Sequence, residues 1–206
     1  MAHATGSGGD RDPVVIYGGA VEPVEINAGG WYLRALRADE RIDDRPALVA
    51  AFTDPELLRW VPHYSVTTVH DAGGYVALRA RQWADGSRCS WAVAEPTTGA
   101  LVGEVGLQHV DRHWQGADVG CWAAPAVRGR GVLTAVLPAV LRWAFAPVEL
   151  GGLGLHRVGY RHAAGNAASE RLARRCGFRL DGHLRDAALV DGERRDLRAW
   201  SRLATD

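Results

Sequence analysis

The residues best suited to chemistry lie in one short stretch in which glycines alternate with arginines, Val127-Arg128-Gly129-Arg130-Gly131. The two glycines allow backbone to approach an anion closely, because they carry no Cβ. The two arginines add positive charge that suits a polyanionic ligand. A helical pattern of apolar residues follows, so the loop opens a helix whose first N–H groups carry partial positive charge. The stretch therefore predicts a pyrophosphate-binding loop.

Other phosphate-binding motifs fit this chain less well. There is no GxxxxGK[ST], which excludes a P-loop, and Gly129-Arg130-Gly131 lacks the third glycine of GxGxxG. The competing interpretation is a surface strand-to-helix turn that is rich in arginine and glycine.

A strand must precede this loop and a helix must follow it. Residues 117–123 predict the strand, and residues 130–145 predict an amphipathic helix with Pro138 inside, which should kink it or delay its start. Asn166 is expected to cap a short helix that Gly177 closes, with Phe178 packing back on Ala173. Further strands are expected at 31–36, 90–94, 101–110 and 155–161, helices at 45–52 and 71–83 (N-cap His70 or Asp71), and a hairpin over 180–203 around Asp191-Gly192. The order predicts a mixed α/β fold with a central sheet.

The N-terminal thirty residues differ in composition from the rest of the chain. Residues 1–12 are small, polar and glycine-rich, and are expected to be disordered. Residues 13–30 form an extension in which 14–17 could be an extra strand and 27–30 a turn. The main domain is expected to span residues 31–206.

Composition excludes several classes of protein. All 24 basic residues are arginines, but the formal net charge is zero, so no basic face for nucleic acid is indicated. Three scattered cysteines indicate neither a zinc site nor a disulfide framework, and a reducing cytoplasm fits best. Neither a membrane span nor a signal peptide is expected. We therefore expect a cytoplasmic protein with no metal, no nucleic-acid partner and no membrane contact.

Four motifs in order resemble the GNAT acetyltransferases, and specifically the ribosomal-protein N-terminal acetyltransferase (RimJ/RimL-type) branch. The likeness covers roughly residues 31–203. It rests on the strand Asp118-Val119-Gly120-Cys121-Trp122 with the loop at 127–131, on Leu155-His156-Arg157-Val158, on Asn166-Ala167-Ala168-Ser169 with Cys176-Gly177-Phe178, and on the closing hairpin with Leu184-Arg185-Asp186 and 191–197.

The resemblance implies a mixed, mostly antiparallel sheet of about six or seven strands, flanked by helices and split at the strand that binds CoA. It implies acetyl-CoA as co-substrate, with direct transfer of the acetyl group to an amine. The backbone of Cys121, Trp122 and Ala123 would bind the pantetheine arm. Asn166 would contact the same arm, and Ser169 would lie near the thioester sulfur. The implied pyrophosphate cradle consists of Arg128, Gly129, Arg130, Gly131, Val132 and Leu133.

The sequence departs from the branch at two places, of which the second concerns the general base. Ala126 stands at the first position of the loop, often Gln or Arg in the family. Ala187-Ala188 stand where the branch often has a carboxylate. Glu104, in the strand expected beside the acetyl end, is one candidate base, although a salt-bridged strand carboxylate is an equal interpretation. Asp186 is another, since it would share a strand face with Ala188 if that strand is regular.

Ser169 completes the candidate catalytic set as a donor to the leaving thiolate. His109 and His113 have a suitable intrinsic pKa and remain further candidates for the base. Cys121 as an acylated nucleophile is an alternative that lacks an evident base.

The acceptor amine is open at this point. A protein or peptide N-terminus competes with a small-molecule amine, and the choice depends on residues 54–83 and the closing hairpin. Trp60, His63, Tyr64 and Trp83 could line the acceptor pocket, although core packing is the simpler interpretation for the tryptophans. Other functions to weigh are a non-catalytic CoA-binding module for sensing or scaffolding, and an acyltransferase that uses another donor such as succinyl-CoA. A homodimer is compatible with the sequence.

Overall fold

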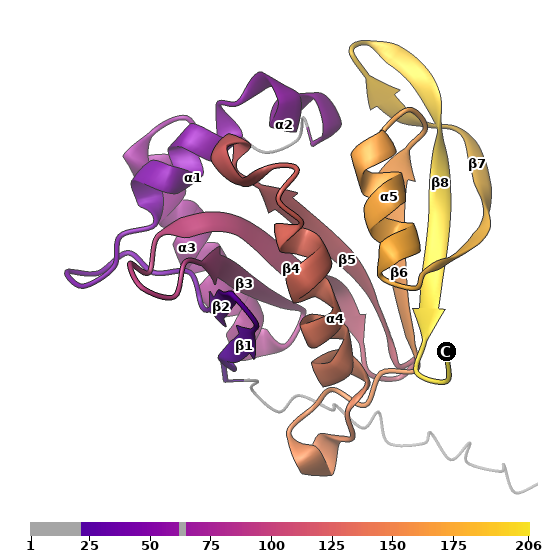
Figure 1. Cartoon of the computed structure of the whole chain (residues 1–206), viewed down its shortest axis with the longest axis horizontal. Coiled ribbons are helices and arrows are strands. Elements are labelled where there is room, and N and C mark those ends of the chain that lie inside the picture. Colours follow the sequence, from indigo (N-terminus) through magenta and orange to yellow (C-terminus); the bar gives the residue numbers. More distant parts are fainter. Residues whose placement is uncertain (1–21, 62–64) are drawn as a thin grey trace, which may run out of the picture.

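A computed structural model describes residues 22–61 and 65–206, which form one eight-stranded sheet with helices on both faces (Figure 1). The strand order is β1-β2-β3-β4-β5-β6-β8-β7, and only β5 and β6 run parallel. The strands are β1 Ile26–Ala28, β2 Trp31–Arg34, β3 Arg88–Ala94, β4 Leu101–Asp111, β5 Gly116–Ala123, β6 Arg157–Ala163, β7 Arg179–Val190 and β8 Glu193–Leu203. The predicted mixed and mostly antiparallel sheet is confirmed.

The helices form a layer on each side of the sheet. They are α1 Arg45–Phe52, α2 Pro55–Trp60, α3 Val69–Asp85, α4 Val132–Phe145 and α5 Ala167–Arg175, with short 3-10 turns η1 Pro125–Val127 and η2 Val148–Leu150. One group of buried residues joins α4 and α5 to one sheet face, and a second joins α1, α2 and α3 to the other. Figure 1 shows α4 lying across one face of the sheet, with α5 beside β6 and β8.

The sheet is split where β5 and β6 diverge. The two strands pair only from Gly116↔Arg157 to Val119↔Tyr160. Beyond that point β5 continues to pair with β4 as far as Ala123, and β6 continues to pair with β8 as far as Ala163. The predicted split at this strand is confirmed, and it leaves a wedge between two half-sheets.

The helix after the glycine loop starts two residues later than predicted. Gly131 adopts φ +76°, a left-handed conformation that cannot lie inside a right-handed helix, so α4 begins at Val132 and not at Arg130. The helix continues past Pro138 to Phe145, although proline lacks the N–H that would bond the carbonyl of Thr134.

The C-terminal part agrees closely with the sequence pattern. The side chain of Asn166 accepts a hydrogen bond from the Ser169 N–H and so caps α5. Gly177 follows the helix at φ +78°, and the Phe178 N–H returns to the Ala173 carbonyl at 3.0 Å. Asp191 and Gly192 both have positive φ and form the two-residue turn of the β7–β8 hairpin.

Four local predictions were wrong. The eighth strand, β1, includes Asn27 and Ala28, so the turn is confined to Gly29-Gly30. The N-cap of α3 is Thr68, which forms a capping box with Asp71. The β6 strand begins at Arg157 and not Leu155, because the Leu155 N–H bonds the carbonyl of Ala144 at the end of α4. The β2 strand ends at Arg34, two residues early. The strand considered at residues 14–17 lies outside the described residues.

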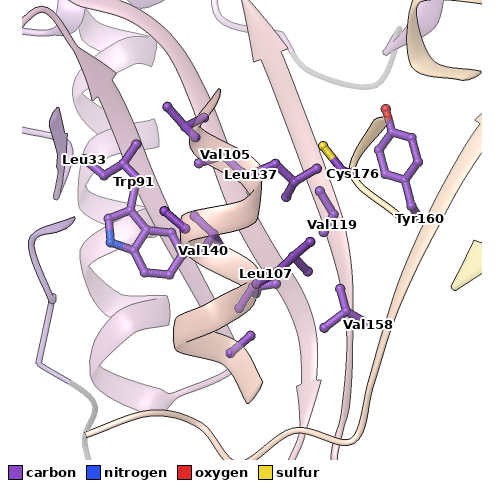
Figure 2. Packing of buried hydrophobic residues seen from close by; sticks show 14 of the residues in the cluster. Leu33, Trp91, Val105, Leu107, Val119, Leu137, Val140, Val158, Tyr160 and Cys176 are labelled. Atoms are coloured by element: carbon purple, nitrogen blue, oxygen red, sulfur yellow. The ribbon is translucent and has the colours of Figure 1, made fainter. Parts of the chain in front are cut away.

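The larger core lies between the sheet and α4 (Figure 2). Leu137 and Val140 of α4 pack on Trp91, Leu107 and other apolar residues of the sheet. Trp83 is 1% exposed, and its ring meets Trp91 edge-on at 4.9 Å, which confirms the core interpretation for this tryptophan. None of the helices in the described part of the chain has both the length and the apolar character needed to cross a membrane.

Candidate functional site

A cavity of about 410 Å³ opens at the split between β5 and β6. Three of its walls come from the ends of these strands, the first turn of α5, and the inner faces of α1, α2 and α3. The β7–β8 hairpin supplies the fourth through Ala188, Leu189, Val190 and Leu197. The lining includes eight of the candidate site residues: Glu104, Cys121, Trp122, Ala123, Arg128, Leu133, Asn166 and Ser169.

The end of β5 offers free backbone to this cavity. Cys121, Trp122 and Ala123 pair with β4 on one side, whereas their partner strand on the other side has diverged. Backbone N–H and C=O groups on that side can therefore pair with the amides of an extended ligand, as a further strand would.

The glycine loop presents a helix N-terminus that no side chain caps. Gly129 and Gly131 adopt φ +74° and +76°, and α4 has neither a capping side chain nor an acidic residue in its first turn. A Cβ placed on either glycine would meet nothing within 4 Å, so the space above the loop is open. Arg130 and Val132 complete the turn beside it. The arrangement suits an anion.

Arg128 does not point freely into this space. Its Nη2 donates to the carboxylate of Asp54, and its Nε donates to the carbonyl of Ala123 at 3.1 Å. The bond to Arg128 holds the pKa of Asp54 below its usual value. Asp54 also accepts from the Leu57 N–H and so caps α2. The loop is thereby tied to the helix on the opposite wall.

Two hydroxyl groups lie where β6 meets α5. Ser169 stands in the first turn of α5 and lines the cavity. The Tyr160 side chain reaches the same place from β6, with its hydroxyl 4.0 Å from the Cys121 sulfur and in interaction with Ser169. Burial raises the pKa of Tyr160 well above its ordinary value, so the phenol stays protonated. Burial also raises the pKa of Cys121 to about 12, which disfavours a nucleophilic thiolate.

Glu104 is a buried carboxylate that four side chains surround. Its Oε2 accepts from the Tyr75 hydroxyl at 2.7 Å and from Trp122 Nε1 at 3.2 Å. Its Oε1 faces Arg79 Nε at 3.4 Å and Arg88 Nη2 at 3.5 Å. Since a carboxylate has about four acceptor sites, these donors occupy it. The geometry supports an anchoring role and leaves little room for a direct proton transfer.

Asp186 does not share a face with Ala188. The β7–β8 register shifts between Leu184 and Ala188, and Asp186 adopts φ +52°, so the alternation of side chains is broken there. Ala188 lines the cavity and Asp186 does not. The condition of a regular strand is therefore not met, and Asp186 is exposed, which gives no support for a role as the base.

The two candidate histidines also lie apart from the cavity lining. The His109 side chain is 72% exposed and lies 3.4 Å from Asp118. The His113 ring meets Trp114, which is itself exposed.

Sequence reasoning missed a third histidine, His162, which is buried in the cavity wall. Its Nε2 accepts from Trp200 Nε1 at 3.1 Å, and its Nδ1 lies 3.0 Å from the Ala163 carbonyl. Both ring nitrogens are engaged, and burial lowers its pKa. Alternation in β6 places this residue and Tyr160 on one face, but no local motif distinguishes them from core residues.

Helix α2 was also missed, because six residues are too few to show a helical period. It brings Glu56, Leu57 and Trp60 to the cavity, so Trp60 lines the pocket, although core packing was the simpler interpretation for it. His63 and Tyr64 lie outside the described residues. No group of three or more His, Cys, Asp or Glu side chains that could hold a metal occurs in the described parts of the chain.

Comparisons with known proteins agree with this geometry. Residues 32–179 match the family described as "Acetyltransferase (GNAT) domain". YdaF of Bacillus subtilis (strain 168), provisionally named a ribosomal N-acetyltransferase, is 33% identical over 105 residues, which are 51% of this chain and 55% of YdaF. The chain thus spans about half the length of that relative.

Two solved structures share the fold over most of the chain. The ribosomal-protein-S5-alanine acetyltransferase from Vibrio fischeri has a TM-score of 0.76 and 16% identity, covering 89% of this chain and 98% of the other. RimL, a ribosomal α-N-protein acetyltransferase solved in complex with coenzyme A, has a TM-score of 0.73 and 20% identity, covering 87% and 98%.

Proposed function

Because the chain belongs to the GNAT acetyltransferase family, we propose that it transfers the acetyl group of acetyl-CoA directly to an amine. The single observation that carries this proposal is the cavity that opens at the split in the sheet, next to an uncapped helix N-terminus. The likeness to RimL, whose structure contains coenzyme A, supports CoA as the carrier of the acyl group.

The proposed donor site follows the β5 edge. The pyrophosphate binds the N–H groups at Gly129 to Leu133, where the dipole of α4 is positive. The pantetheine arm extends along Cys121 to Ala123 and pairs with the free edge of β5. The oxygen of Asn166 caps α5, which leaves its amide nitrogen to donate to a pantetheine carbonyl.

The proposed chemistry forms one C–N bond and breaks one C–S bond. The amine nitrogen attacks the thioester carbonyl, the thiolate leaves, and the amine loses its proton. Ser169 donates its proton to the departing thiolate and takes one back from solvent, with the protonated Tyr160 hydroxyl beside it. Glu104 fixes Tyr75 and Trp122 in the wall, and ordered water carries the amine proton to solvent.

We favour the N-terminus of a peptide or protein as acceptor over a small-molecule amine. Two names support this choice: YdaF is provisionally named a ribosomal N-acetyltransferase, and RimL is named a ribosomal α-N-protein acetyltransferase. The cytoplasm, where ribosomal proteins are made, is the corresponding location, and the three free cysteines are compatible with it.

Thermal denaturation with acetyl-CoA tests the donor site. A ligand at a hundred times its dissociation constant should add about 2.7 kcal/mol to the free energy of unfolding, which raises the midpoint temperature by several degrees. Acetyl-CoA should also release free CoA thiol in the presence of a hexapeptide with an unmodified N-terminal alanine. Binding without thiol release from any peptide or amine would favour a sensing or scaffold module, and a preference for succinyl-CoA would change the donor.

A further inference from the structure

One face of α2 lines the cavity. Glu56, Leu57 and Trp60 stand at positions i, i+1 and i+4 of this helix, and all three line the cavity. Trp60 Nε1 donates to Glu56 Oε1 at 2.9 Å. The carboxylate is therefore held at the cavity rim, and its other oxygen remains an acceptor toward solvent.

Glu56 is one of two carboxylates in the cavity lining of the described chain, and the two differ in what surrounds them. Glu104 is 1% exposed and faces two arginines, a tyrosine and a tryptophan. Glu56 is exposed and accepts one tryptophan N–H. A positively charged ligand entering the cavity therefore meets an available negative charge at Glu56 and a compensated one at Glu104.

The position of Glu56 is set by contacts at both ends of α2. At the start, Asp54 caps the helix and binds Arg128 of the glycine loop. Further along, Arg59 forms an ion pair with Asp191 at the tip of the β7–β8 hairpin, with 2.8 Å between Nε and Oδ2. The helix is thus bonded to the glycine loop at one end and to the β7–β8 hairpin at the other. On that hairpin, Ala188 and Leu189 line the cavity and carry no charge.

The cavity that Glu56 lines also has an aromatic wall. The Phe52 ring lies 5.3 Å from Tyr75 and 5.7 Å from Trp122, centroid to centroid, and all three side chains line the cavity. Such a wall excludes water once a ligand enters, and the lower dielectric strengthens an ionic contact at its edge.

We infer that Glu56 is the residue that binds the amino group of the acceptor in its protonated form, so that the enzyme selects cationic amines. The inference rests on the proposed function. An α-amino group has a pKa of about 7.7–8.0 and arrives mostly as an ammonium ion at neutral pH. Glu56 holds the ion at the rim, and the neutral amine formed by loss of a proton to water moves on to the thioester.

A ligand with a fixed charge tests this binding separately from turnover. The probe is a hexapeptide whose N-terminal nitrogen is trimethylated, so that it keeps its charge and cannot be acetylated. Calorimetry on CoA-saturated protein should show about tenfold weaker binding of this probe to Glu56→Gln than to the unmodified protein. The N-acetylated hexapeptide, which has no charge at its N-terminus, should bind both proteins equally. Glutamine retains the acceptor for Trp60, so the helix is expected to keep its place.

Glu149→Gln is the matched control, because Glu149 is an exposed glutamate of η2 outside the cavity lining. It should bind the charged probe as the unmodified protein does. Equal affinity of Glu56→Gln and the unmodified protein for the charged probe would overturn the inference. So would an equal loss for the N-acetylated peptide, since that loss would reflect shape and not charge.

Steady-state kinetics separates this inference from the proposed function. With the unmodified hexapeptide, Glu56→Gln should raise KM for the peptide about tenfold and change kcat little. If the unmodified protein turns over the peptide and Glu56→Gln has the same KM for it, the proposed function stands and the role of Glu56 is wrong. If the unmodified protein releases no thiol, the proposed function falls, and the charged probe still decides whether Glu56 binds cations.

Discussion

Ser169 lies in the first turn of α5 and lines the cavity. Its backbone N–H donates to the Asn166 Oδ1 at 3.0 Å, so the backbone that carries the hydroxyl is held in place. A donor at this place stabilises negative charge on sulfur only as the C–S bond breaks. It should therefore affect the rate far more than it affects binding of the thioester.

We expect Ser169→Ala to lower kcat by about 10²-fold, with acetyl-CoA affinity changed less than twofold. Stopped assays of thiol release and calorimetry with CoA measure the two quantities. Ser201→Ala is a suitable control, because Ser201 bonds Asp181 and is outside the cavity lining. An unchanged kcat would assign thiolate protonation to Tyr160 or to solvent.

His162 makes stability depend on pH in a defined direction. Burial lowers its pKa from the ordinary value of 6.5, and its Nε2 must be unprotonated to accept from Trp200. The unfolded chain therefore takes up this proton at higher pH than the folded chain does. The contribution to stability is complete above pH 6.5 and is lost as the pH falls through the lowered pKa.

The midpoint temperature should accordingly fall between pH 6.5 and pH 5 more steeply for the unmodified protein than for His162→Gln. Glutamine can accept from Trp200 but does not titrate. Scanning calorimetry in matched buffers measures both slopes. Parallel slopes would show that other groups, such as the ion-paired aspartates, dominate the acid response.

At the scale of elements, the glycine loop and the start of α4 are the part proposed to bind the donor. Gly129 and Gly131 have positive φ and open space above them. An alanine at either position should cost about 1 kcal/mol of folding free energy for its backbone conformation alone. Its methyl group would also occupy the space that we propose for the phosphate oxygens.

Gly129→Ala and Gly131→Ala should therefore weaken CoA binding more than tenfold while lowering the midpoint temperature by only a few degrees. Gly29→Ala provides the comparison, since Gly29 has φ +67°, meets nothing within 4 Å, and lies in the β1–β2 turn. It should share the loss of stability and keep full CoA affinity. Normal CoA binding by both loop variants would show that the phosphates lie elsewhere.

The sequence could predict the elements that are determined by residues close together in the chain. The α5 cap, the β7–β8 turn and the strand before the glycine loop each depend on residues within a few positions of one another, and all three were confirmed. The surroundings of Glu104 and Asp186 and the position of α2 depend on residues that are distant in the sequence. Glu104 of β4 meets Arg79 of α3, and the register shift beside Asp186 is set by the pairing of β7 with β8. Such contacts follow from the assembled fold and leave no short pattern.

At the scale of the whole molecule, the strand pairing between the two half-sheets is limited to four residue pairs of β5 and β6. The strands β1 to β5 belong to the first 150 residues with α1 to α4, and β6, β8 and β7 belong to the remainder with α5. Buried residues continue across the junction, where Leu137 and Val158 are in the same core as Phe178 and Trp200. Each half-sheet is therefore a continuous length of chain, although neither closes the cavity alone.

This division predicts that the protein can be cut into two fragments that reassemble. Leu150 is 79% exposed at the end of η2, and the glycines that follow lie between the two halves of the chain. Fragments 1–150 and 151–206, produced together, should associate through the shared core and regain stabilisation by acetyl-CoA. Neither fragment should respond to acetyl-CoA when produced alone. The CoA site would then act as a reporter of proximity, active only when two separately encoded polypeptides are brought together.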